Sequence, residues 1–313
     1  MKHVFIVNPV SGKADASGVV VPRIIAAAGR AGIDYTIELT SAPRHAIRLA
    51  EQYASGGEEV RLYSCGGDGT LNEVLTGAWT HPNAQVACIP CGSGNDFVKN
   101  FGTQEDFLDL DDMIRGVPVS IDLMRTSEGI SAAICSAGLD AQVAYGIPKF
   151  RRVPLCGGAM AYNLSILENL CSHLGRKMEI IVDDEVFEEE CLLAAVCNGK
   201  AYGGGFMAAP EARMDDGLLD VVIVRKISRL RIASLMSTFK KGGHFQDGEV
   251  LAACREIVLF RRGRKVSLHP TDGAPLVVNV DGECSKQSGL EAEVMPGAAR
   301  IVLPGRLAPL KTV

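Results

Sequence analysis

The chain has 313 residues, of which 47% are apolar and 22% are charged, and its formal net charge is −5. This size allows two domains with hydrophobic cores, and the acidic balance excludes nucleic-acid binding through overall charge. No run reaches the roughly 18 apolar residues that span a bilayer. The sequence enters an apolar, strand-like segment at residues 4–7, without a signal peptide, so we expect a cytoplasmic protein. Ten cysteines, mostly inside apolar segments, favour reduced, buried thiols.

Strand-like and helix-like segments alternate over the first third of the chain. Strand patterns cover 3–7, 33–39, 60–64 and 85–89, and helical spacing of apolar residues lies between them. The first helical pattern ends at Gly32, a typical stop signal. This order predicts a parallel, doubly wound sheet, in which ligands bind beyond the carboxyl ends of the strands.

Each of these four strands runs into a turn of small, polar or glycine residues. The third turn, 65–73, holds three glycines around Asp68 and leads directly into a helical pattern. Glycine allows the backbone to approach a ligand, and the first amides of the following helix favour an anion. A bare carboxylate would repel phosphate, so Asp68 would meet a phosphate through Mg²⁺ or water. The alternative is an ordinary strand–helix turn in which Asp68 or Thr70 caps the helix.

The pattern changes after 116–118, where many strand-like runs follow with only two long helical patterns, 157–172 and 228–242. This pattern of many strands and few helices predicts a second, mostly antiparallel domain. We therefore expect domains at 1–123 and 124–303, with the tail 304–313 packing back on the first. The expected strands are 119–124 (carrying Asp122), 130–136, 177–183, 191–197, 218–224, 256–260, 264–268, 276–280 and 299–303.

Three motifs resemble the diacylglycerol kinase catalytic-domain family. They are Asn8-Pro9-x-Ser11-Gly12, the stretch Gly66–Glu73 with the sequence GGDGTLNE, and the stretch Gly92–Phe97 with the sequence GSGNDF. Later segments, 199–210, 215–220 and Asp281-Gly282-Glu283, resemble the same family in the same order along nearly the whole chain. The GGDGT core is shared with NAD kinases, whereas its LNE extension and the GSGNDF loop favour lipid kinases related to diacylglycerol and sphingosine kinases.

The resemblance implies an N-terminal, phosphofructokinase-like α/β domain and a C-terminal, β-sandwich-like domain, with ATP bound between them. It implies an ATP- and Mg²⁺-dependent lipid kinase that transfers the γ-phosphoryl group to a lipid hydroxyl, with diacylglycerol as the leading acceptor. Relatives form dimers, so the resemblance leaves open whether this chain forms a homodimer. By the same resemblance, the nucleotide would be lined by Asn8, Pro9, Ser11, Gly12, Thr40, Gly66, Gly67, Asp68, Gly69, Thr70, Glu73, Gly92, Ser93, Asn95 and Asp96.

The resemblance also implies the catalytic carboxylates. Asp281 and Glu283 would form the acidic pair, with Glu283 favoured as the base, and Asp68 and Asp122 would support Mg²⁺. Asp281-Gly282 could equally be an ordinary hairpin turn, because Asp-Gly is a common turn dipeptide. A second, structural Mg²⁺ would be held by Asp216 with carbonyl groups near Met214 and Leu218.

The segment 225–265 carries eleven basic and three acidic residues, a surplus of eight positive charges in an acidic protein. Leu230, Ala233, Met236 and Phe239 suggest an amphipathic helix within it. Such a segment can bind an anionic lipid surface, and each basic residue close to the surface contributes about 1 kcal/mol of binding free energy. We expect peripheral membrane contact here, and the alternative is a solvated basic face.

Two other functions stay open at this point. An NAD kinase is one, because the GGDGT core is shared, although the loop at 92–97 argues against it. The other is a nucleotide-binding regulator without activity, against which the presence of Asp68, Asp281 and Glu283 argues.

Overall fold

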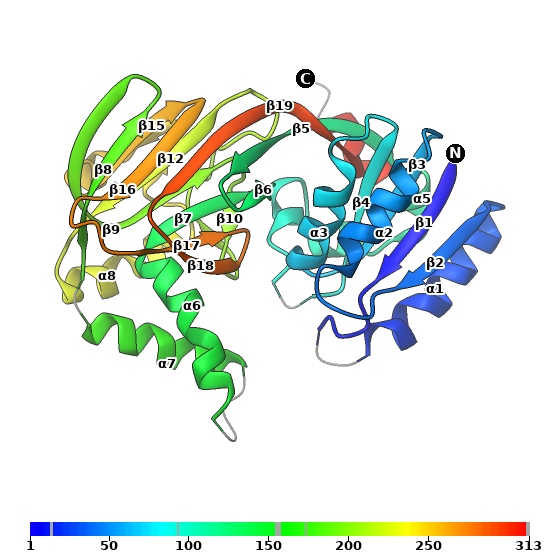
Figure 1. Cartoon of the computed structure of the whole chain (residues 1–313), viewed down its shortest axis with the longest axis horizontal. Helices are drawn as coiled ribbons and strands as arrows, with labels where there is room; N and C mark the ends of the chain where they lie inside the picture. The colour runs from blue at the N-terminus through cyan, green and yellow to red at the C-terminus, as the bar shows by residue number, and fades with distance from the viewer. Residues whose placement is uncertain (13–14, 93, 154–157, 173, 311–313) are drawn as a thin grey trace. The chain divides into compact units, whose positions relative to one another are not determined.

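The computed structural model describes residues 1–12, 15–92, 94–153, 158–172 and 174–310. The chain forms two compact units (Figure 1). Unit 1 comprises Met1–Leu123 together with Met295–Val313, and unit 2 comprises Met124–Val294. The C-terminal return to the first unit thus begins at 295, earlier than the expected 304, because the end of the last strand pairs within the sheet of unit 1.

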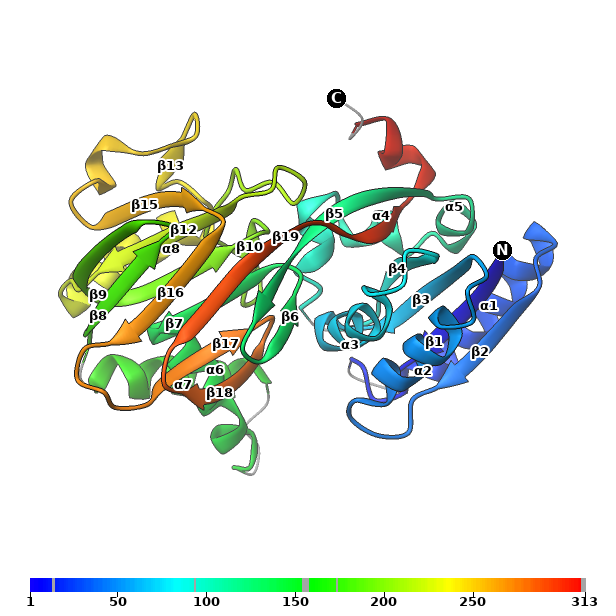
Figure 2. The same cartoon turned by 45° about the horizontal axis from the view of Figure 1, so that its top comes forward.

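Unit 1 is built on a parallel sheet with strand order β4-β3-β1-β2, and β19 (Leu290–Leu303) runs parallel to β4 through Ile301 and Val302. Helices α2 and α3 cover one face of this sheet and α1 covers the other (Figure 2). The doubly wound prediction is therefore confirmed. The elements are β1 (Lys2–Val7), α1 (Ala16–Ala31), β2 (Tyr35–Leu39), α2 (His45–Ala54), β3 (Val60–Gly66), α3 (Asp68–Ala78), β4 (Ala84–Pro90), η1 (Phe97–Asn100), α4 (Gln104–Phe107), α5 (Leu110–Ile114), most of β5 (Val117–Thr126) and η3 (Gly305–Leu310).

Local signals in the sequence set the ends of the first helix. Asp15 caps α1 by accepting a hydrogen bond from the backbone N–H of Ser17 at 2.9 Å. Gly32 ends the helix in the left-handed conformation, with φ of 63°. Strands β3 and β4 are buried along their whole length, as expected for parallel strands covered on both faces.

Unit 2 is mostly antiparallel, which confirms the second prediction. Its strand order is β18-β17-β7-β9-β8-β16-β19, and β12 pairs with both β9 and β15. Its remaining elements are β6 (Gly129–Ser131), β7 (Ile134–Gly138), α6 (Leu139–Arg151), α7 (Gly158–Cys171), β8 (Arg176–Val182), β9 (Glu185–Cys197), β10 (Ala201–Tyr202), β11 (Phe206–Met207), β12 (Leu219–Arg225), α8 (Arg229–Lys240), β13 (Phe245–Gln246), β14 (Glu249–Val250), η2 (Ala252–Cys254), β15 (Val258–Gly263), β16 (Lys265–Pro270), β17 (Leu276–Val280) and β18 (Glu283–Gln287).

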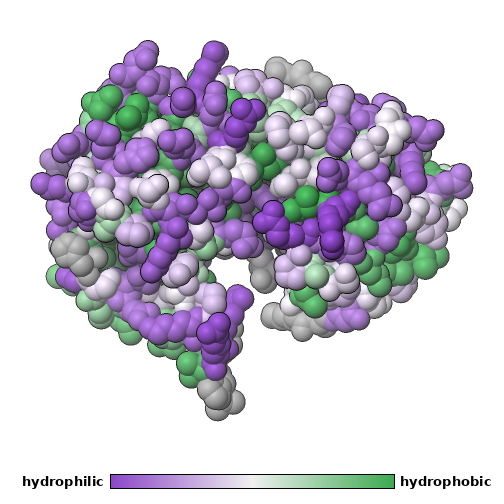
Figure 3. All heavy atoms as spheres, in the orientation of Figure 1, coloured by the Kyte–Doolittle hydropathy of each residue, from purple (hydrophilic) through white to green (hydrophobic). Residues whose placement is uncertain are grey.

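Helices α6 and α7 form a hairpin at one end of unit 2 (Figure 1). The hydroxyl of Ser165 in α7 donates to the carbonyl of Val143 in α6 at 2.6 Å, and Ala161 is fully buried at the contact. Hydrophobic surface follows the lower edge of the hairpin, with hydrophilic surface beside it (Figure 3). The sequence predicted α7 but not α6.

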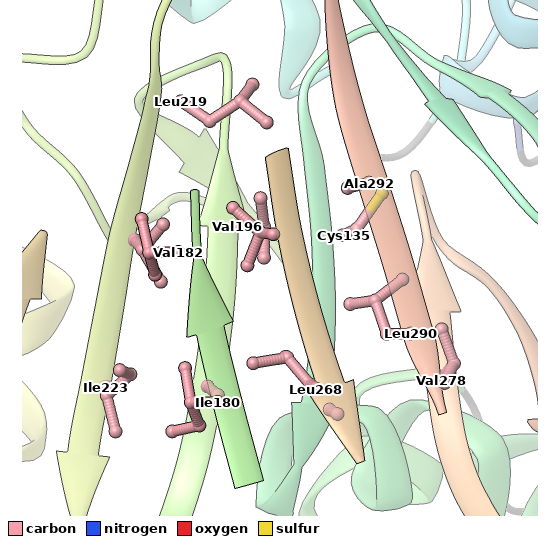
Figure 4. Close-up of a cluster of buried hydrophobic side chains, with 14 of the residues drawn as sticks. Cys135, Ile180, Val182, Val196, Leu219, Ile223, Leu268, Val278, Leu290 and Ala292 are labelled. Carbon is pink, nitrogen blue, oxygen red and sulfur yellow. The ribbon is translucent and has the colours of Figure 1, made fainter. Parts of the chain in front are cut away.

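The core of unit 2 lies on both faces of its sheet. The largest apolar cluster takes side chains from β8, β9, β16 and β19, among others, and Ile180, Val196, Leu268 and Leu290 belong to it (Figure 4). A second cluster, on the opposite side of β9 and β12, includes Cys197. Because both faces are covered, this sheet provides a rigid base for the loops at its edges.

Candidate active site

The order of the parallel strands in unit 1 changes side at β1, because β2 lies on one side of β1 and β3 lies on the other. Ligands of open α/β sheets bind beyond the carboxyl ends of the strands at such a point. Asn8, which directly follows β1, donates from Nδ2 to Oγ1 of Thr70 in α3 at 2.9 Å. Its side-chain oxygen accepts from the backbone N–H of Val10 at 3.2 Å. Asn8 therefore ties the first turn to the third.

Glycines let the loops after β1, β3 and β4 pack backbone against backbone. A Cβ atom on Gly92 would lie 2.5 Å from Cα of Gly67. A Cβ atom on Gly12 would lie 2.8 Å from the carbonyl oxygen of Cys91, and Gly12 has φ of 86°. No side chain fits at these two contacts, so the three loops meet through their backbones. Converging backbone N–H groups of glycine-rich turns are a common way to bind an anion.

Asp68 joins the third turn to the fourth. It is the first residue of α3, and its two carboxylate oxygens accept the backbone N–H groups of Asp96 and Phe97, each at 3.1 Å. Gly67 is the N-cap of α3 and provides no side-chain cap, so neither Asp68 nor Thr70 caps this helix. The capping alternative is therefore wrong, and the side chain of Asp68 instead joins the start of α3 to the turn after β4.

Asn95 shapes the fourth turn from within. It has φ of 51°, its Oδ1 accepts the N–H of Gly92 at 3.1 Å, and its Nδ2 donates to the carbonyl of Gly92 at 2.7 Å. Asp96 forms an ion pair with Lys99. Ser93, which we expected beside the nucleotide, lies outside the described residues. Hydrogen bonds between its own residues thus define the shape of the described part of this loop.

Glu73 has a role that the sequence did not indicate. Its two carboxylate oxygens accept the backbone N–H groups of Arg44 and Ala46, at 2.9 and 3.1 Å. These amides begin α2, whose own N-cap residue gives no side-chain hydrogen bond. Glu73 of α3 therefore caps α2 and fixes the turn that follows Thr40. The backbone N–H of Thr40 in turn donates to Val7 at 2.9 Å.

Asp122 is buried in unit 1 and accepts the backbone N–H of Gly297 at 2.7 Å. Gly297 has φ of 62° within β19, which pairs with β5. Asp122 therefore fixes the backbone of β19 at this left-handed position. Its expected support of Mg²⁺ is a separate prediction.

Asp281 is held by a full set of donors in unit 2. Its carboxylate accepts from Oγ of Ser131 at 2.9 Å and from three consecutive backbone N–H groups at 2.6, 3.0 and 3.0 Å. Those amides belong to Ala132, Ala133 and Ile134, where the expected strand 130–136 is interrupted. Asp281, with φ of 47°, and Gly282, with φ of 97°, form the turn between β17 and β18. The hairpin interpretation is thus right for Asp281.

Glu283 has a different environment from its neighbour. It is the first residue of β18, and its side chain is exposed. The acidic pair therefore divides into one carboxylate bound to the protein and one that faces solvent. Geometry alone favours Glu283 over Asp281 as the group that meets a substrate.

Asp140, in the first turn of α6, was not indicated by the sequence. Both of its carboxylate oxygens are buried without a hydrogen bond of good geometry. Burial raises the pKa of this carboxyl group above its usual range, and the nearby hydroxyls of Ser136 and Tyr202 offset part of the rise. Cys284, the residue after Glu283, lies beside α6, with its Sγ 3.8 Å from the carbonyl of Ala141. Burial raises the pKa of the Cys284 thiol to about 12.

Asp216 forms a tight turn in unit 2. Its Oδ1 accepts the backbone N–H of Leu218 at 3.0 Å, and Gly217 between them has φ of 71°. Its carboxylate and the carbonyls of Met214 and Leu218 are oxygen donors, the type that Mg²⁺ prefers. Within the described ranges, no three His, Cys, Asp or Glu side chains are grouped to hold a metal ion. A metal here would depend on backbone carbonyls and water.

The segment 225–265 carries less free charge than its composition indicates, because several of its cations pair with carboxylates. The pairs are Arg225–Glu189, Lys226–Glu190, Arg255–Glu249, Arg261–Glu185 and Arg262–Asp220. Its expected helix is α8, in which Ile232 is buried while Leu230 is 86% exposed. In the part of the chain that the structure describes, no helix has the length and apolar character needed to cross a bilayer.

Comparisons with known proteins point to one family. Residues 2–126 match the family model described as diacylglycerol kinase catalytic domain. Residues 133–303 match the model described as YegS C-terminal NAD kinase beta sandwich-like domain. These two matches cover the motifs of both units in chain order.

Individual relatives agree with these matches. The chain is 27% identical over 284 residues to a diacylglycerol kinase of Staphylococcus carnosus, covering 90% of this chain and 88% of the relative. It is 29% identical over 251 residues to a protein of Shewanella frigidimarina named probable lipid kinase YegS-like, covering 78% and 76% of the two chains. A crystal structure of a diacylglycerol kinase from Bacillus anthracis has the same fold, with a TM-score of 0.68, 20% identity and 98% coverage of both chains.

Proposed function

We propose that the acceptor is diacylglycerol and that the metal is Mg²⁺. The chain belongs to the family of lipid kinases with a diacylglycerol kinase catalytic domain and a YegS-type C-terminal domain. The chain is a lipid kinase, and ATP is its phosphoryl donor. The names of relatives such as the Staphylococcus carnosus enzyme support diacylglycerol as the acceptor. The product would then be a phosphatidate.

We assign the ATP phosphates to the turns after β1, β3 and β4. Their glycines allow the backbone to approach a ligand closely, and the chain has no Walker A sequence to supply a lysine instead. Asn8, Asp68 and Asn95 hold these turns together without a ligand, so the phosphates would meet a preformed surface. Preorganised hydrogen-bond donors of this kind lower the free-energy cost of binding the phosphates and of stabilising the charge that develops on them in the transition state.

The oxygen donors of this site suit Mg²⁺. Asp68 would hold it, since its carboxylate lies between the glycine turns after β3 and β4. When bound, Mg²⁺ neutralises charge that develops on the phosphates during transfer. We keep Asp122 as a proposed supporting residue, and Asp216 with the carbonyls of Met214 and Leu218 as a proposed second, structural site.

Glu283 is the proposed general base, and the contrast with Asp281 is the observation that carries this assignment. The four donors around Asp281 occupy its carboxylate, whereas Glu283 is exposed. As the acceptor oxygen forms its bond to the γ-phosphorus, the bond to the β-phosphate bridging oxygen breaks and ADP leaves. Glu283 takes the proton of the hydroxyl group in this step.

A phosphorylation assay with radiolabelled ATP tests this proposal. The full chain is incubated in mixed micelles with diacylglycerol, a sphingoid base or a polyprenol, and in buffer with NAD, each with and without Mg²⁺. We expect Mg²⁺-dependent label in phosphatidate above all other products. Preferential labelling of another lipid would show that diacylglycerol is not the preferred acceptor. Labelling of NAD would favour the NAD kinase alternative. Full activity in the presence of a chelator would show that the reaction does not need Mg²⁺.

A further inference from the structure

Unit 2 contains a groove with a volume of about 510 Å³. Its walls are the first turn of α6, the start of β8, the middle of β9 and the loop between β16 and β17. All of the residues that line it belong to unit 2. Clefts of this size are typical of sites that bind small molecules.

Part of the lining of this groove is apolar and continuous with the core of unit 2. Leu174 and Leu192 belong to one core cluster, and Met178 and Leu276 belong to the largest one. All four are nearly fully buried, so they present a fixed surface. Among the described residues that line the groove, none is aromatic. A nucleotide base or a sugar would find no ring to stack on, so the lining favours a hydrocarbon chain.

Arg176 builds the polar side of the groove. Its guanidinium donates to the carbonyl of Pro275 at 2.7 Å and to the carbonyl of Ala274 at 2.6 Å. It also forms an ion pair with Asp272, whose carboxylate accepts the backbone N–H of Ala274 at 3.0 Å. The donors of Arg176 are therefore taken by the loop between β16 and β17, which they hold in place as one wall of the groove.

Lys177 gives the groove a positive charge that the protein leaves available. Glu190, the second carboxylate of the lining, forms an ion pair with Lys226 at 2.9 Å. Lys177 lies opposite Glu190 in the pairing of β8 with β9, and its side chain is exposed. Within the described residues, no carboxylate pairs with Lys177. Since both carboxylates of the lining are already paired with cations, the groove favours a ligand with a negative head group.

The groove is separated from Glu283 by the length of β17. Leu276 begins this strand and lines the groove, whereas Val280 ends it and pairs with Glu283. The four-residue step between these two positions spans about 13 Å of extended strand. A head group held at the groove is therefore distinct from the hydroxyl group that we expect to react at Glu283. Diacylglycerol, moreover, carries no charge for Lys177 to bind.

We propose that this groove binds the anion of a fatty acid. The hydrocarbon chain lies against the buried leucines and Met178, where its removal from water drives binding, and the carboxylate meets Lys177. The amide of Gln142, in the first turn of α6, is a further polar group of the lining. The inference goes beyond the proposed function, because binding at this groove needs neither ATP nor an acceptor.

Calorimetric titration of the full chain with dodecanoate, without nucleotide and below the concentration at which micelles form, tests the groove. We expect one saturable site with a Kd in the micromolar range. Dodecyltrimethylammonium has the same chain with a positive head group, and butyrate has the same head group with a short chain. Each should bind at least about tenfold more weakly than dodecanoate, because each lacks one of the two contacts.

Two pairs of matched variants locate the site. Lys177→Glu should weaken dodecanoate binding about tenfold, because the carboxylate then meets a negative charge. Lys265→Glu makes the same change at an exposed lysine of β16 outside the groove, so it should bind like the unaltered chain. Gln142→Trp should remove binding because its ring fills the groove, whereas Gln142→Ala leaves the groove open and should keep most of the affinity. Circular dichroism checks that every variant is folded.

Three results would overturn the proposal. The first is a lack of saturable dodecanoate binding to the folded chain, and the second is equal affinity in the variants at 177 and 265. The third is displacement of dodecanoate by dioctanoylglycerol, a soluble form of the expected acceptor, because the groove would then belong to the acceptor site. Each measurement reports binding rather than phosphoryl transfer, so an error in the proposed acceptor or metal leaves this proposal standing.

Discussion

Asp281 and Glu283 are separated by one glycine, and their different surroundings decide their roles. Asp281 accepts four hydrogen bonds at the turn between β17 and β18, whereas the side chain of Glu283 is exposed. Three of these donors meet Oδ1 and one meets Oδ2, so proton uptake by Asp281 would disturb hydrogen bonds that hold this turn. The two residues should therefore respond to substitution in different ways.

Glu283→Gln keeps the size of the side chain but removes its ability to take a proton. We expect kcat to fall by about 10²–10⁴-fold, the range typical of general-base catalysis, with little change in ATP affinity. Steady-state assays with diacylglycerol and calorimetric titration with ATP measure the two effects. Near-normal turnover would place the base elsewhere.

Asp281→Asn should act on stability first. The amide group cannot accept all four hydrogen bonds, and its NH₂ would face backbone N–H donors, so at least one buried amide is left unsatisfied. We expect a loss of about 1–3 kcal/mol in the free energy of unfolding. Asparagine tolerates the left-handed φ of 47°, so backbone strain does not contribute. A stable variant with the kcat loss of Glu283→Gln would instead make Asp281 the base.

Asp140 makes stability depend on pH in a predictable direction. Burial raises its pKa in the folded chain above the ordinary value of 3.8. Above about pH 4 the unfolded chain releases this proton and the folded chain keeps it, so the unaltered protein loses stability as pH rises toward the folded pKa. Asp140→Asn has no such loss. The melting temperature of the variant minus that of the unaltered protein should therefore increase between pH 4 and pH 7, and a constant difference would contradict the raised pKa.

At the scale of elements, the sequence predicted most helices and strands that have a clear hydrophobic periodicity or clear stop signals. The four parallel strands, α7, α8 and the mostly antiparallel second unit follow from alternation, apolar spacing and glycine stops. α6 was missed, because Gly146 and Pro148 interrupt its pattern and usually argue against a helix. The split of 130–136 into two strands was missed too, because it depends on Asp281, which is distant in sequence.

In the candidate site, too, the sequence did not predict contacts between residues that are distant along the chain. Motifs located the turns after β1, β3 and β4, but not the bonds that hold them together. Glu73 was expected beside the nucleotide, yet its carboxylate caps α2. Cysteine burial was predicted correctly for residues such as Cys65 and Cys88. Contacts between side chains and distant backbone amides leave no local pattern, so only the fold reveals them.

The close packing of the glycine turns predicts how they respond to an added methyl group. In Gly92→Ala the new Cβ would lie 2.5 Å from Cα of Gly67, so the turns after β3 and β4 must move apart. We expect at least a tenfold loss of ATP affinity in a folded protein, measured by calorimetric titration. Gly29→Ala in α1 is the matched control, because its Cβ meets nothing within 4 Å, and it should gain about 0.5–1 kcal/mol of stability. Equal ATP affinity in both variants would remove the turn at 92 from the binding surface.

At the scale of the whole molecule, unit 1 is discontinuous in sequence. Its first 123 residues are completed by residues after 294, so the turns that we propose to bind ATP depend on a segment that is synthesised after unit 2. In that segment Ile301 and Val302 pair with β4, and both are fully buried. Such a long-range contact delays the folding of unit 1 until this segment has been synthesised.

A chain that ends at Val294 should therefore lose unit 1. It lacks the buried side chains of Ile301, Val302 and Leu303, each worth about 1.5–3 kcal/mol, and exposes the edge of β4. This loss is comparable with the whole stability of a domain. Hydrogen exchange should show unprotected amides in β1, β3 and β4, and calorimetry should show no ATP binding. A chain that ends at Leu303 keeps the strand and loses buried Pro304, η3 and partly exposed ion pairs such as Arg306–Asp106. These contacts lie outside the proposed ATP site, so this chain should bind ATP like the full chain. Normal ATP binding by the chain that ends at Val294 would mean that the first 123 residues fold without the C-terminal strand.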